Sequence, residues 1–109
     1  MIEFTAAGAP RIVSETIEQT ATAHGSVSAI VVPWESDRAR LSMSVTAVRS
    51  DGWAIEHTNL GTITLTDLGN GSTRVAIVGH APDHPEKQKL TALLDRFAQQ
   101  LQTRLDVAS

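Results

Sequence analysis

The residues best equipped for chemistry in this sequence are its histidines, two of which stand close to a carboxylate. His80 and His84 flank Asp83, and His57 lies earlier in the chain. Imidazole and carboxylate groups are ligands that zinc and similar ions accept. The spacing matches no known zinc pattern, and Pro82 prevents the two neighbouring histidines from sharing a regular helix. We therefore expect loop and helix-capping roles for these residues, with no metal site and no cofactor.

His57 also suggests acid/base chemistry, because Glu56 directly precedes it. Adjacent residues of a strand point to opposite faces of a sheet, so these two side chains do not form a dyad with each other. His57 would instead share a face with Trp53 and Ile55. It could be a polar group inside an apolar pocket, or it could sit in water at the end of the sheet. No catalytic residue follows from this pattern.

Large aromatic side chains are the other candidates for a binding site. Trp34 and Trp53 are the only tryptophans, and Phe97 lies in an apolar stripe near the C-terminus. Such side chains line ligand cavities, but they fill cores and interfaces more often. We therefore name Trp53, His57 and Phe97 as candidate ligand-binding residues, with core packing as the alternative explanation for the aromatic ones.

A long C-terminal helix is the clearest element that could position these side chains. One apolar stripe recurs there at helical spacing, formed by Leu90, Leu93, Leu94, Phe97, Ala98, Leu101 and Leu105. Asp83 can cap the helix, Pro85 suits its first turn, and Glu86 can complete a capping box. We expect a helix from about residue 84 to 106, lying with its apolar side on a flat surface.

Alternation of apolar and polar residues predicts the sheet that provides this surface. It marks strands near residues 27–32, 41–48, 53–58, 61–66 and 73–78. The loop 67–72 indicates a hairpin, and residues 59–61 look like a turn or a bend. Ile2 begins a further edge strand, and the residues between Pro10 and Gly25 favour a short helix.

The resulting element order is β-α-β-β-β-β-β-α, which predicts an α+β fold. We expect a curved antiparallel sheet of five to six strands, packed against the long C-terminal helix, with a short N-terminal helix. The 109 residues contain no linker or repeat, so residues 1–109 are expected to form one domain.

The second half of the chain resembles the SRPBCC superfamily, the START/Bet v 1-like and polyketide-cyclase-like helix-grip proteins. The resemblance rests on the strand at 61–66, the glycine-rich loop at 67–72, the strand at 73–77, and the closing helix. Ala9-Pro10 after the first strand adds a weaker likeness. The N-terminal half is shorter than in family members. The resemblance implies an apolar pocket between sheet and helix, suited to a small hydrophobic molecule, and it carries over no catalytic residue.

Composition restricts the alternatives further. The formal net charge is −3 and there is no cysteine, so we expect no nucleic-acid partner, no disulfide and no thiol chemistry. The sequence shows no signal peptide and no apolar run long enough to span a membrane, which predicts a cytoplasmic protein. Arginine outnumbers lysine and alanine is frequent, as in proteins from GC-rich bacterial genomes.

Three functions remain open at this point. The first is a small helix-grip-like binding protein for a small hydrophobic molecule. The second is a homodimeric interaction or structural protein without a small-molecule site, in which a second copy covers sheet surface or an edge. The third is a cyclase-type enzyme, which would require a buried ionisable group, with His57 the best candidate.

Overall fold

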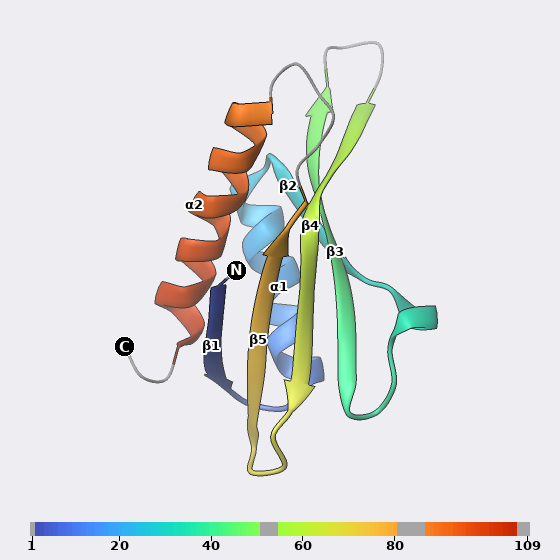
Figure 1. Cartoon of the computed structure of the whole chain (residues 1–109), viewed down its shortest axis with the longest axis vertical. Coiled ribbons are helices and arrows are strands. Elements are labelled where there is room, and N and C mark those ends of the chain that lie inside the picture. The colour runs from blue at the N-terminus through green and yellow to red at the C-terminus, as the bar shows by residue number, and fades with distance from the viewer. Residues whose placement is uncertain (1, 51–54, 81–86, 107–109) are drawn as a thin grey trace.

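The computed structural model describes residues 2–50, 55–80 and 87–106. Its elements follow in the order β1 (Ile2–Ala7), α1 (Pro10–His24), β2 (Val27–Val31), the 3-10 helix η1 (Pro33–Glu35), β3 (Arg40–Ser50), β4 (Ile55–Asp67), β5 (Ser72–Gly79) and α2 (Lys87–Leu105). Figure 1 shows the two helices beside the sheet. The α+β prediction is confirmed, with five strands and a helix-grip-like layout.

The five strands form one antiparallel sheet in the order β1-β5-β4-β3-β2. Strands β2 to β5 are neighbours in both sequence and space, because each short connection returns the chain beside the strand it has just left. β1 instead pairs with β5 at the far edge. The first and second strands therefore form the two edges of the sheet, with α1 connecting them.

Residues 59–61 do not form the turn or bend that the sequence suggested. They lie inside β4, where the register against β3 shifts and leaves Leu60 as the extra residue of a β-bulge. Position 61 requires glycine for a steric reason and not because the chain turns there. A Cβ on Gly61 would lie 2.3 Å from the carbonyl oxygen of Val78 on the neighbouring strand. The two strands predicted on either side of this point are therefore one strand of 13 residues.

The short N-terminal helix is confirmed as α1. Pro10 stands in its first turn, and Gly25 ends it in the left-handed conformation with φ of 85°, where glycine is favoured. The Gly25 N–H donates to the carbonyl oxygen of Ala21 at 3.2 Å. The buried side of the helix carries Val13 and Ile17, which face the sheet.

The C-terminal helix α2 is described from Lys87 to Leu105, within the predicted range. The proposed capping residues Asp83, Pro85 and Glu86 lie outside the described residues. The buried positions of α2 are Leu94, Phe97, Ala98 and Leu101, which belong to the predicted stripe. None of the helices in the described ranges is long and apolar enough to cross a lipid bilayer.

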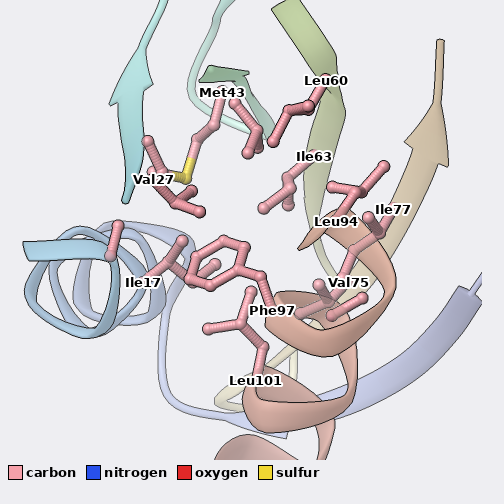
Figure 2. Packing of buried hydrophobic residues seen from close by; sticks show 14 of the residues in the cluster. Ile17, Val27, Met43, Leu60, Ile63, Val75, Ile77, Leu94, Phe97 and Leu101 are labelled. Atoms are coloured by element: carbon pink, nitrogen blue, oxygen red, sulfur yellow. The ribbon is translucent and has the colours of Figure 1, made fainter. Parts of the chain in front are cut away.

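Both helices share one hydrophobic core on one face of the sheet. Phe97 is fully buried and lies between α2 and Ile17 of α1, with Val75 and Leu101 nearby (Figure 2). Met43 and Ile63, also fully buried, supply the sheet side of this core. The core therefore needs side chains from both helices and from the central strands.

Trp34 does not contribute to that core. It lies in η1, after the edge strand β2, and its exposed fraction is 84%. A role in the core, which was one expectation for this residue, is therefore excluded.

Candidate functional site

An apolar groove of about 410 Å³ runs between the N-terminal half of α2 and the end of the sheet formed by β1, β4 and β5. Just over half of its lining residues are aliphatic, namely Ile2, Leu60, Ile77, Leu90, Leu94 and Ala98, and the others are glycine or polar. Such a concave and mainly apolar surface has the size of a small-molecule site.

Helical spacing explains why α2 lines this groove. Lys87, Thr91 and Asp95 recur every four residues, and Leu94 stands between them on the side that faces the sheet. Leu94 lies close to the end of β5, because Gly79 has no side chain there. A Cβ on Gly79 would lie 3.1 Å from Leu94 Cδ2. The glycine therefore allows the helix to approach the end of the strand closely.

Polar groups surround the rim of the groove. The side chains of Lys87 and Asp95 are exposed, so one cation and one carboxylate face solvent there. The Thr91 hydroxyl donates to the Lys87 carbonyl oxygen at 2.9 Å. His80 also lines the groove, but its imidazole Nε2 lies 2.9 Å from the hydroxyl of Thr62, which alternates with the buried Gly61 and Ile63 and so belongs to the other face of the sheet. The rim thus has balanced charge, and the apolar floor offers the main attraction for a ligand.

The structure does not bring the three predicted ligand-binding residues together. Trp53 lies outside the described residues. His57 is exposed and pairs with Val48, whose side chain alternates with the buried Ala47, so it lies on the face away from the helices. Phe97 is a core residue, and its ring meets that of His24 edge-on at 6.3 Å between centroids. Neither His57 nor Phe97 lines the groove.

Several residues that do line the groove had a signal in the sequence. Leu90 and Leu94 belong to the predicted helical stripe, but periodicity does not distinguish a groove wall from a core contact. Leu60 was hidden by the interpretation of residues 59–61 as a turn. Gly79, at the end of a predicted strand, could have indicated a close approach between backbone and side chain.

The histidine considered as a metal ligand in the sequence, His80, lies at the same end of the sheet. In the parts of the chain that the structure describes, no three His, Cys, Asp or Glu side chains gather so as to hold a metal ion. His80 has the Thr62 hydroxyl as its partner. Asp83 and His84 lie outside the described residues, so the structure does not place the complete set considered from the sequence.

Comparison with protein-family models, with curated protein sequences and with solved structures finds no match to this chain.

Proposed function

We propose that the protein binds a small hydrophobic molecule in the groove beneath the N-terminal half of α2. The observation that carries this proposal is the groove itself, about 410 Å³ in volume, with six aliphatic side chains in its lining. Its position between a C-terminal helix and an antiparallel sheet is the one that the helix-grip resemblance implied. Neither His57 nor Phe97 lines the groove, so the proposed site differs from the one suggested by the sequence.

The expected affinity follows from the apolar character of the groove. A ligand that removes roughly 250 Å² of apolar surface from water gains about 6 kcal/mol before the entropic cost of association. Because that cost consumes part of the gain, we expect weak binding, with dissociation constants of about 0.1 to 1 mM. The polar rim would contact a hydroxyl or carbonyl at one end of the ligand, while Lys87 and Asp95 give little preference for ionic charge.

We also propose that the chain is a shortened member of the SRPBCC superfamily. The five-stranded sheet, the connecting α1 and the covering α2 support this assignment. The residue that the sequence offered for a cyclase-type activity, His57, is exposed on the other face of the sheet, away from the groove. Ligand binding without chemistry is therefore the simpler function for this groove.

A neutral fluorescent probe tests the proposal directly. N-phenyl-1-naphthylamine should gain fluorescence with the wild-type protein and lose it when aliphatic alcohols or small aromatics compete. Thr91→Phe places a bulky side chain at the groove and should weaken probe binding at least tenfold. Gln100→Phe is the matched control, because this exposed residue lies nine positions later, on the opposite side of the same helix.

Probe binding that responds equally to both substitutions would contradict the groove as the site. Absence of binding by the folded wild-type protein, with native circular dichroism, would reject the proposed function.

A further inference from the structure

We propose that a second copy of this chain pairs with the edge strand β2, in an antiparallel contact centred on Ala29. The proposal concerns the opposite edge of the sheet from β1, so it is independent of the groove at α2. It rests on the direction of the free backbone groups of β2, on the register that they allow, and on the exposed apolar side chains nearby.

The hydrogen bonds between β2 and β3 determine which backbone groups face the edge. The Val32 N–H donates to Ser42 O at 2.8 Å, and the Val48 N–H donates to Ser26 O at 2.9 Å. In an antiparallel ladder alternate residues face the same neighbour, so the even-numbered residues of β2 are the ones that bond to β3. The N–H and C=O groups directed to the free edge are those of Val27, Ala29 and Val31.

The two edges of the sheet differ in how they are protected. At the β1 edge, Asp106 forms a bridge with Ala6 just after α2 ends, and Glu3 adds a charge to the strand. The β2 edge has no such bridge among the described residues, and the strand Val27–Val31 contains neither a charged residue nor a proline. Edge strands without charge, proline or cover are open to pairing with another strand.

Only one symmetric register uses every free group of β2. With Ala29 on the twofold axis, Val27 of each copy faces Val31 of the other, and all outward N–H and C=O groups are paired. A shift in one direction places Val27 opposite Pro33, which has no N–H. A shift in the other direction places Val31 opposite Gly25, whose N–H already donates to Ala21. The strand is therefore complementary to itself in a single register.

The side chains around the edge are compatible with this pairing. Ile30 is 58% exposed and Trp34 is 84% exposed, so apolar area lies beside the strand, as an interface of roughly 800 Å² per partner requires. A depression of about 380 Å³ follows the same edge between β2 and α1. Glu18 is the only charged residue that lines it among those described, so each copy brings a single carboxylate.

Sedimentation velocity on the full chain, from about 5 to 500 µM, tests the association. We expect a reversible dimer. Ile30→Lys should weaken it at least tenfold, because two ammonium groups would lie diagonally across the axis. Val78→Lys is the matched control, since Val78 is also exposed on a strand but lies on β5, away from this edge. Circular dichroism verifies that both variants are folded.

Cysteine pairing tests the register, because the chain contains no cysteine. Ser28 and Ile30 of the two copies would form a non-hydrogen-bonded pair with Cα atoms about 4.5 Å apart, a separation that a disulfide accepts. A mixture of Ser28→Cys and Ile30→Cys chains should therefore crosslink on mild oxidation, in higher yield than either variant alone. A monomer at 500 µM, a dimer insensitive to Ile30→Lys, or equal crosslinking in all three samples would overturn the proposal.

Discussion

The two halves of α2 pack on the same sheet but differ in how completely their apolar side chains are buried. In the C-terminal half, Phe97 and Leu101 are fully buried and pack with Ile17 of α1 (Figure 2). In the N-terminal half, Leu90 is only partly buried and faces the groove, and no described residue of α1 lines that groove. A single apolar stripe is therefore a core contact where a second helix closes over it, and a groove wall where none does.

The largest difference between the halves should appear when a stripe residue is truncated. Phe97→Ala should reduce the free energy of unfolding by about 3–5 kcal/mol, because it leaves a cavity in a closed core. Leu90→Ala should cost about 1 kcal/mol, since this side chain is already partly in water. Urea denaturation followed by far-ultraviolet circular dichroism measures both values. Equal costs would show that the N-terminal half of α2 is packed as closely as the C-terminal half.

Two glycines near the groove provide the next comparison. Gly61→Ala should destabilise the fold by about 2 kcal/mol or more, because its Cβ would collide with the backbone oxygen of Val78 at 2.3 Å. Gly79→Ala meets only the end of the flexible Leu94 side chain at 3.1 Å, so its stability cost should stay below about 1 kcal/mol.

Gly79→Ala should instead affect the shape of the groove. Moving Leu94 changes the shape of the floor, so Gly79→Ala should weaken binding of the neutral naphthylamine probe while thermal unfolding stays close to that of the wild type. An unchanged probe affinity would indicate that the ligand does not reach this end of β5.

The smallest expected difference in stability is between the loss of a buried hydroxyl and the loss of an exposed one. Arg104 Nη1 donates to the Thr20 hydroxyl at 2.9 Å, which connects α2 to α1 in the closed half. Thr20→Val should cost about 1 kcal/mol, because it removes the acceptor. Thr91→Val, at the groove, removes a hydroxyl that bonds only to its own helix and should change stability by less than about 0.5 kcal/mol. Chemical denaturation of the two variants and of the wild type provides the measurement, and similar costs would contradict the comparison.

Local pattern was sufficient for most of the secondary structure. The stripe from Leu90 to Leu105 predicted α2, Pro10 and Gly25 marked the ends of α1, and the glycine-rich loop at 67–72 identified the hairpin between β4 and β5. Each of these signals depends on residues close together in the sequence, whose spacing or backbone preference acts before the chain is folded.

The residues of the candidate site could not be predicted from local sequence patterns. Leu60 lines the groove because a bulge shifts its strand, and the position of that bulge depends on pairing with β3 and on the close approach of β5 at Gly61. The face on which His57 lies is likewise set by the register of β4. A shift of one residue reverses the face of every side chain on a strand, and alternation alone does not reveal it.

The sequence by itself determined the α+β class, both helices and the antiparallel hairpins, because these follow from local periodicity and turn chemistry. Only the tertiary structure decided which part of the α2 stripe is core and which part lines a groove. It also decided that Trp34 is exposed and that β2 forms a free edge. The reason is physical: burial depends on which distant elements pack together, and residues of the same type have different roles according to what covers them.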